Sequence, residues 1–161
     1  MTPGAPGPTG RAQRYWLTRF VILRLLGFVY AVAFLAAANQ IIPLIGAHGL
    51  LPLPLFLGRV REALGSTPAA FLRLPSLFWM AHSDGALVAV AWIGVALSCV
   101  VLAGYANAII MAVLWILYMS IVHVGQDWYG YGWEIQLLET GFLAIFLCRW
   151  WMGGLFQNAR L

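Results

Sequence analysis

The sequence predicts an all-α membrane protein, a bundle of about four transmembrane helices, and its composition is the first reason. The 161 residues are 63% hydrophobic and only 9% charged, with a mean hydropathy of +0.87. A soluble domain is about 45–50% apolar and about 25% charged. The second reason is that several apolar runs approach the roughly 20 residues that a helix needs to cross a bilayer.

The first predicted span covers residues 20–38, and it follows a Pro/Gly-rich tail over residues 1–13 that we expect to be disordered. The transmembrane domain as a whole is expected over residues 14–152, followed by a C-terminal tail over residues 153–161. Arg24 lies about one turn inside the first span. Its long stem allows it to reach the near interface, and an interior ion pair is the alternative.

Between the first and second spans, three prolines interrupt an apolar segment, at Pro43, Pro52 and Pro54. Proline breaks a continuous helix, and irregular backbone does not face lipid in the hydrocarbon core. We therefore expect a Pro-broken interfacial or re-entrant loop here, followed by short helices at the membrane surface.

The remaining spans are predicted at residues 86–104, 106–122 and 135–151. Only Tyr105 separates the second from the third, which predicts a tight hairpin between antiparallel neighbours. Tryptophans flank the fourth span as an aromatic belt would. Four spans place both ends of the chain on the same side of the membrane.

The charges bear on orientation and on the class of partner. All nine basic residues are arginines, which indicates a GC-rich, bacterial genome, and their scatter forms no stripe of the kind that binds nucleic acid. Arginines near both ends of the chain predict a bacterial inner-membrane protein with both ends cytoplasmic. The three arginines in the first loop argue against this orientation. The nine are Arg11, Arg14, Arg19, Arg24, Arg59, Arg61, Arg73, Arg149 and Arg160.

One carboxylate, Glu139, falls inside the fourth predicted span, where a charge costs several kcal/mol and rarely lacks a partner or a task. His123 ends the third span, and Gln40 follows the first, on the same side of the membrane. Asp127 lies four residues after His123, on the same face if the helix continues. With Glu134, these residues form a predicted polar cluster under the extracytoplasmic surface, centred on Glu139 and His123.

Other interpretations of these residues remain open. Arg24 and Glu139 would lie near opposite edges of the core, so the topology argues against an ion pair between them. Polar residues also gather at helix ends because water is there, and Asp127 and Glu134 are then ordinary loop charges. A buried Glu139 could be protonated and hydrogen-bonded to a carbonyl.

The two cysteines, Cys99 and Cys148, sit in apolar runs without metal-ligand spacing. A disulfide framework or a zinc site is therefore not expected. We predict no metal, no cofactor and no catalytic residue from the sequence.

Four stretches carry a resemblance to a known family: RFVILRLLGFVYAVAFL, IIPLIGAHGLLP, FLRLPSLFW and HVGQDWYGYGWEIQLLETGFLAIFL. Together they resemble the N-terminal membrane region of the lipase maturation factor family, from about residue 19 to residue 148. The last stretch is the most specific, because an aromatic-glycine turn followed by WEIQLLETGFLAIFL is not a generic span.

The resemblance implies a membrane protein that helps secreted lipases reach an active fold, as eukaryotic members do in the endoplasmic reticulum. It also implies a distant kinship with the membrane domain of vitamin K-dependent gamma-carboxylase. Family members continue into further spans and a soluble domain, so we expect a truncated or short member here. Its partners would be the lipid bilayer and a secreted lipase-like client or a separate C-terminal soluble domain. The alternatives are a carboxylase-like membrane enzyme using Glu139 and His123, or a small oligomeric transporter.

Overall fold

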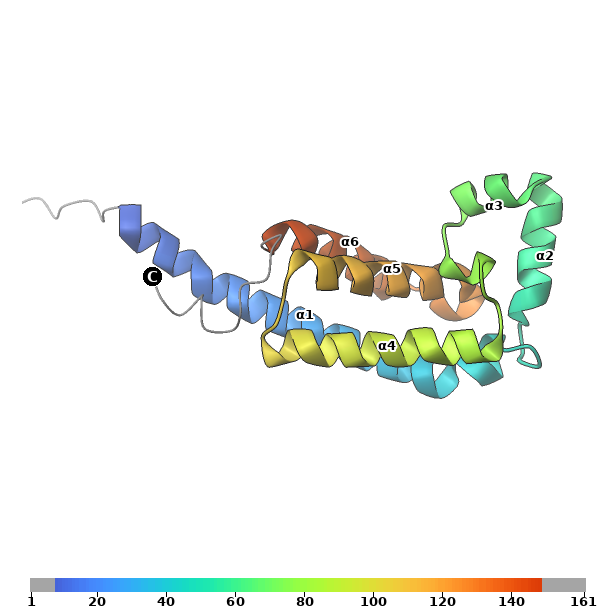
Figure 1. Ribbon diagram of the computed structural model, residues 1–161, viewed down its shortest axis with the longest axis horizontal. Helices are drawn as coiled ribbons and strands as arrows, with labels where there is room; N and C mark the ends of the chain where they lie inside the picture. Colours follow the sequence, from blue (N-terminus) through green and yellow to red (C-terminus); the bar gives the residue numbers. More distant parts are fainter. Residues whose placement is uncertain (1–7, 149–161) are drawn as a thin grey trace, which may run out of the picture.

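The computed structural model describes residues 8–148, and within that range the regular secondary structure is all helical, with no strand. The helices are arranged along the chain as Figure 1 shows. Their bounds are α1 Pro8–Ile45, α2 Leu53–Leu64, α3 Thr67–Arg73, α4 Asp84–Ala103, α5 Ala108–Val124 and α6 Gly132–Leu147, with 3₁₀ helices η1 at Leu77–Trp79 and η2 at Gln126–Tyr129. The predicted all-α class is confirmed.

Helices α1, α4, α5 and α6 run alongside one another (Figure 1), with α1 packed mainly on α4 and α5 on α6. Two helices of the described part are long and apolar enough to cross a membrane: α1 over Leu17–Ile45 and α4 over its 20 residues. Helix α5 is equally apolar but has 17 residues. The membrane character is therefore supported, while the number of crossings stays a prediction.

Helix α1 is longer than the first predicted span. It begins at Pro8, within the stretch expected to be a disordered tail, and it runs through Pro43 to Ile45. Pro43 lies in the last turn of α1 and cannot donate the helix hydrogen bond to the carbonyl four residues earlier, and the helix ends two residues later. The carbonyls of Pro43 and Leu44 accept from the N–H groups of Leu50 and Leu51 at 3.0 and 2.9 Å. Residues 1–7 and 149–161, including the predicted C-terminal tail and the end of the fourth span, lie outside the described residues.

The segment between α1 and α4, residues 46–83, is mostly helical and lies over one end of the four helices. We call this segment the cap. Helix α2 crosses that end, and α3 turns back beside it (Figure 1). Proline suits the first turn of a helix, and Pro52 and Pro54 stand at the start of α2. Leu53 and Leu57 are the residues that α2 buries. The helix is interrupted between Ile45 and Leu53, as the prolines predicted, but Pro52 and Pro54 then begin a new helix where a longer irregular loop was expected.

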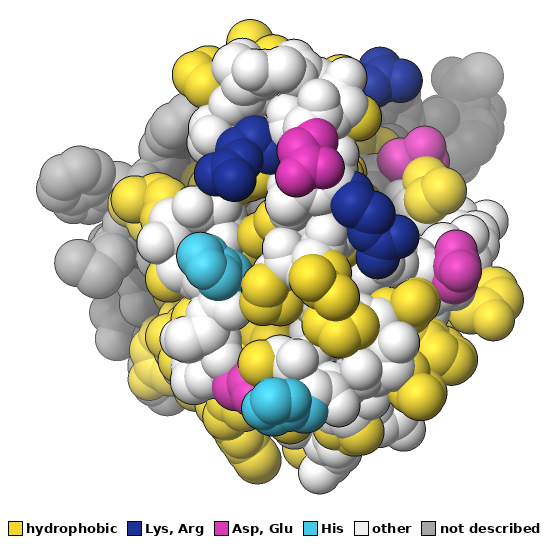
Figure 2. Space-filling model, turned by 90° about the vertical axis from the view of Figure 1, so that its right-hand side faces the viewer, with side chains coloured by type: hydrophobic (Ala, Val, Ile, Leu, Met, Phe, Trp, Pro, Cys, Tyr) yellow, Lys and Arg dark blue, Asp and Glu magenta, His cyan; other side chains and the backbone are white. Residues whose placement is uncertain are grey.

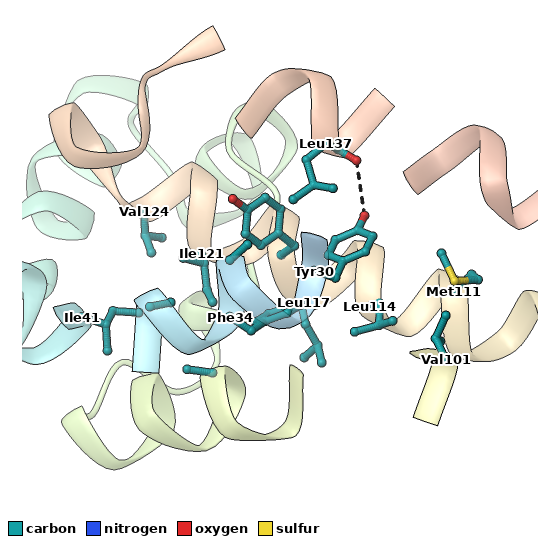
Figure 3. Close-up of a cluster of buried hydrophobic side chains, with 14 of the residues drawn as sticks. Tyr30, Phe34, Ile41, Val101, Met111, Leu114, Leu117, Ile121, Val124 and Leu137 are labelled. Carbon is teal, nitrogen blue, oxygen red and sulfur yellow. Dashed lines mark hydrogen bonds between the residues drawn. The ribbon is translucent and has the colours of Figure 1, made fainter. Parts of the chain in front are cut away.

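The centre of the four-helix assembly is an aromatic cluster of Tyr30, Phe34 and Tyr118, all fully buried. The Tyr118 ring meets the rings of Tyr30 and Phe34 edge to face, with centroids 5.7 and 5.5 Å apart. Gly94 of α4 lies directly against the Phe34 ring, where a Cβ atom would overlap it. Figure 3 shows Tyr30 and Phe34 among the surrounding buried side chains, with the Tyr30 hydroxyl donating to the Leu137 carbonyl of α6 at 3.4 Å.

Candidate functional site

The cap is fastened to α5 by hydrogen bonds that meet at Ser120 and His123. Ser120 Oγ accepts from the N–H of Leu77 at 3.1 Å, and the Ser120 carbonyl accepts from Ser76 Oγ at the same distance. His123 Nδ1 lies 2.7 Å from the carbonyl oxygen of Pro75, so the ring nitrogen donates there. Three polar groups of α5 thus bind the segment 75–77. The Nδ1 atom of His123 is used in this structural contact.

Two further contacts fasten the turn between α1 and α2. Asp84, the first residue of α4, accepts from the N–H of Ala47 through Oδ1 at 2.8 Å. Gln126 adopts a positive φ of 51° and its amide donates to the Leu51 carbonyl at 3.0 Å. The cap is therefore tied to α4, α5 and η2 by side chains that lie far from it in the sequence.

The outer surface of the cap combines exposed apolar side chains with charged ones. Leu72 and Met80 are among the most exposed hydrophobic residues of the described chain, at 82% and 86%. Figure 2 shows this end of the molecule, where basic, acidic and histidine side chains lie among hydrophobic ones. A cleft of about 350 Å³ opens here, lined by Pro54, Leu57, Gly58, Arg61, Thr67, Trp79 and His82.

Under the cap, Glu134 is a buried carboxylate, only 2% exposed. Its Oε2 atom and the hydroxyl of Tyr118 both lack a hydrogen-bond partner among the described residues. The Glu134 charge also acts on Tyr129, whose pKa is raised to about 12, first by burial and then by this carboxylate. Glu134, Tyr118 and Tyr129 therefore form a small polar group at the capped end.

Glu139, in contrast, is exposed on the outer side of α6. The indole N–H of Trp115 donates to the Leu138 carbonyl at 3.0 Å, which fixes the register between α5 and α6. His123 lies eight residues beyond Trp115, or about 12 Å along the helix axis from the level of Glu139. The structure does not bring Glu139 and His123 together, and the two could not share a proton.

The other predicted cluster residues are also apart from Glu139. Gln40 and Asp127 are exposed, Gln40 on α1 and Asp127 on η2. Within residues 8–148, no three metal-ligating side chains of His, Cys, Asp or Glu converge. The predicted cluster is thus a set of separate positions, of which Glu134 and His123 are integrated into the capped end.

Arg24 lies at the opposite end of the helices. Its Nη2 donates to the carbonyl of Ala103, the last residue of α4, at 3.2 Å. Its guanidinium carbon also lies 4.6 Å from the centre of the Phe20 ring. A cation at a helix C-terminus is favourable because the carbonyls there carry partial negative charge. Arg24 thus interacts with a helix end, at the turn that joins α4 to α5.

Comparison with known proteins identifies the family. Residues 17–160 match the sequence model described as the lipase maturation factor transmembrane domain. The chain belongs to the lipase maturation factor family. Lipase maturation factor 1 of Bos taurus is 50% identical over 147 residues, covering 88% of this chain and 26% of that protein. The same factor of Mus musculus is 51% identical over 143 residues, covering 85% and 25%.

A more distant relative is lipase maturation factor 2 of Homo sapiens, which is 32% identical over 134 residues, or 80% of this chain and 19% of that protein. The chain thus spans about a quarter of the length of lipase maturation factor 1. No solved structure matches the chain. These relatives are eukaryotic, and the bacterial source inferred from the arginine usage stays a prediction.

The residue patterns of this family member did not indicate the buried hydroxyl of Tyr118, and they allowed Glu134 to be an ordinary loop charge. No pattern in the sequence singles out Glu134, because the other faces of a membrane helix are also apolar. In the structure, counting from Glu134 by steps of three and four gives Leu137, Gly141 and Ala144, which are the other buried residues of α6. That spacing puts Glu134 on the packed face of the helix. Tyr118 had no signal either, because its unpartnered hydroxyl depends on contacts between α5 and the start of α6.

Proposed function

We propose that this chain is a membrane-embedded maturation factor that assists the folding of a secreted, lipase-like client without covalent chemistry. The observation that carries the proposal is the family match over residues 17–160, with 50% identity to lipase maturation factor 1. Because the chain spans about a quarter of that protein, the activity of the whole relative comes to this chain only as a proposal.

In the proposed arrangement, α1, α4, α5 and α6 all cross the membrane, and α2 and α3 lie at the interface as the cap. Helix α6 has 16 residues in the described range, or about 24 Å of helix, close to the thickness of a bilayer core of about 30 Å. Arg19 and Arg24 lie at the end opposite the cap, which favours that end as cytoplasmic. The cap then faces the extracytoplasmic side of a bacterial inner membrane.

The cap is the part that we propose contacts the client, or a separate soluble domain that grips it. Partly folded proteins expose apolar surface, and Leu72 and Met80 present exposed apolar side chains beside charged residues. Methionine is flexible and polarisable, so it adapts to partners of varied shape. The bonds from Ser120, His123, Asp84 and Gln126 would keep this surface in a fixed position over the membrane.

Co-expression with a secreted lipase tests the proposed activity. The measurement is lipase activity per mass of secreted enzyme, with and without the chain, together with mass spectrometry of what co-purifies with it. We expect higher specific activity with the chain, and loss of that gain in Leu72→Gln/Met80→Gln. Tyr105→Gln is the matched control, since Tyr105 is 50% exposed in the turn at the opposite end. Equal specific activity with and without the chain would contradict the proposal.

The membrane arrangement has its own test. In a background where Cys99 and Cys148 are replaced by serine, single cysteines are placed at His48 on the capped end and at Tyr105 on the other. A membrane-impermeant maleimide applied to right-side-out vesicles should label the first position and not the second. Labelling of both positions from the same side would overturn the proposed crossings.

A further inference from the structure

The outward surface of α6 carries a continuous row of exposed side chains, which we call the outer stripe. It consists of Gln136, Glu139, Thr140, Leu143 and Leu147. Counting from Gln136 to Thr140, Leu143 and Leu147 gives steps of four, three and four residues, the spacing of one helix face. The buried face of α6, which begins at Glu134, is a different one. The outer stripe is therefore a second helix face, exposed among residues 17–148, with its polar side chains toward the N-terminal end of α6.

The position of Glu139 makes this face unlike an ordinary lipid-facing one. Glu139 is the eighth of the 16 residues of α6, so it lies near mid-depth if α6 crosses the membrane, a condition that rests on the proposed function. The side chain of Glu139 is exposed, and it makes no hydrogen bond or ion pair with residues 17–148. A carboxylate in contact with lipid at that depth is unfavourable, and such a residue usually has a partner.

The charge of Glu139 also indicates what kind of partner covers the stripe. A second copy of the chain packed on the same face would bring two Glu139 carboxylates together, which repel each other. A helix with a basic side chain at the same depth would neutralise the charge, and Gln136 and Thr140 could add hydrogen bonds between helices. Arg24 does not serve this purpose, since it interacts with the Ala103 carbonyl at the end of α4.

We propose that the outer stripe of α6 is the docking face for a separate transmembrane helix that carries an arginine or lysine opposite Glu139. The relatives have room for such a helix, because about three quarters of Bos taurus lipase maturation factor 1 lies outside the match. The spacing of the stripe suits a neighbour that crosses α6 at a shallow angle, as in most membrane bundles. Glu139 then acts as an assembly residue of the membrane domain.

The test uses two oligo-leucine helices of about 20 residues as probes, one with a single arginine at its midpoint and one without. Each is reconstituted with the purified full chain in phosphatidylcholine vesicles, and association is measured by energy transfer between labels on probe and protein. We expect the arginine probe to bind about three- to tenfold more tightly than the leucine probe. Glu139→Leu should abolish this preference.

The matched control moves the carboxylate to another helix at the same depth. Ile93 is 50% exposed and is the tenth of the 20 residues of α4, so Glu139→Leu/Ile93→Glu keeps the net charge. If this variant still prefers the arginine probe, charge alone explains the association and the docking face is wrong. Cross-linking between two copies through Leu143→Cys, in the Cys99→Ser/Cys148→Ser background without probe, would also overturn the proposal in favour of self-association.

A separate measurement distinguishes failure of this proposal from failure of the proposed membrane arrangement. In the same cysteine-free background, Glu139→Cys should resist a water-soluble maleimide while His48→Cys reacts. If Glu139→Cys reacts as readily, α6 does not cross the membrane, and both proposals fail. If it is protected and the probes bind equally, the membrane arrangement stands and only the docking face is refuted.

Discussion

Gly141 lies where α6 comes closest to α1, and it offers a sharp test of the packing. A Cβ atom at this position would overlap the Tyr30 hydroxyl oxygen and lie 3.0 Å from Tyr30 Cζ. The Tyr30 ring is fully buried and packs against Phe34 and Tyr118, with centroids 6.1 and 5.7 Å away, so it has little room to move. Gly141→Ala should therefore force α1 and α6 apart or strain the aromatic cluster.

The expected cost follows from comparison with a second glycine of the same helix. Adding a methyl group to a well-packed interior costs about 1–3 kcal/mol. Gly132→Ala is the control, because a Cβ atom there meets nothing within 4 Å. Gly132 is the first residue of α6, whereas Gly141 lies in the helix interior, where alanine gains up to about 1 kcal/mol of helix propensity over glycine. This gain offsets part of the cost of the overlap, so we expect the free energy of unfolding of Gly141→Ala to be about 1–2 kcal/mol below that of Gly132→Ala.

Removing the hydroxyl that blocks the new methyl group should rescue the variant. Tyr30→Phe alone loses one long hydrogen bond to the Leu137 carbonyl, at 3.4 Å, and should cost about 0.5–1.5 kcal/mol. In Gly141→Ala/Tyr30→Phe the overlap with the hydroxyl is gone, and the Cζ contact at 3.0 Å is the closest that remains on that ring. The double variant should be more stable than the sum of the single changes predicts, by about 1–2 kcal/mol.

The assay is reversible unfolding in mixed detergent micelles, with sodium dodecyl sulfate as denaturant and far-ultraviolet circular dichroism as the signal. Additive effects in the double variant would refute the reasoning, because the overlap with the hydroxyl would then not be the cause. Equal stability of Gly141→Ala and Gly132→Ala would refute the close approach of α6 to α1 itself.

Three further predictions concern the capped end. Ser120→Ala removes the acceptor for the Leu77 N–H and should cost about 1–3 kcal/mol, with faster amide hydrogen exchange confined to residues 75–79. Asp84→Ala removes the acceptor for the Ala47 N–H and should destabilise the protein by about 1 kcal/mol, whereas Asp84→Asn, which keeps an oxygen, should cost less in the same unfolding assay. The pKa of Tyr129 is raised from 10.0 to about 12, so an unfolded chain loses this proton first and stability should fall as pH rises from 10 to 12. Tyr129→Phe should make that part of the curve less steep, and an unchanged slope would contradict the shift.

Several features of the fold were predictable from local patterns. The apolar runs over residues 86–104 and 106–122 correspond closely to α4 and α5, because run length and turn residues fix such helices without reference to their neighbours. The specific stretch at the start of α6 also indicated the family that the comparison then showed. The proline-rich segment was harder to predict, because proline is found both after the ends of helices and in their first turns. In the structure Pro52 and Pro54 lie at the start of α2.

What the sequence by itself determined is the all-helical, membrane-adapted composition and the membership in the lipase maturation factor family. Only the tertiary structure decided which carboxylate is buried: Glu134 lies under the cap, and Glu139 faces outward. The physical reason is that lipid is as apolar as a helix interface, so a membrane helix is hydrophobic on every side. Hydrophobicity then identifies the helix but not its packed face, which contacts such as Tyr30 with Gly141 determine.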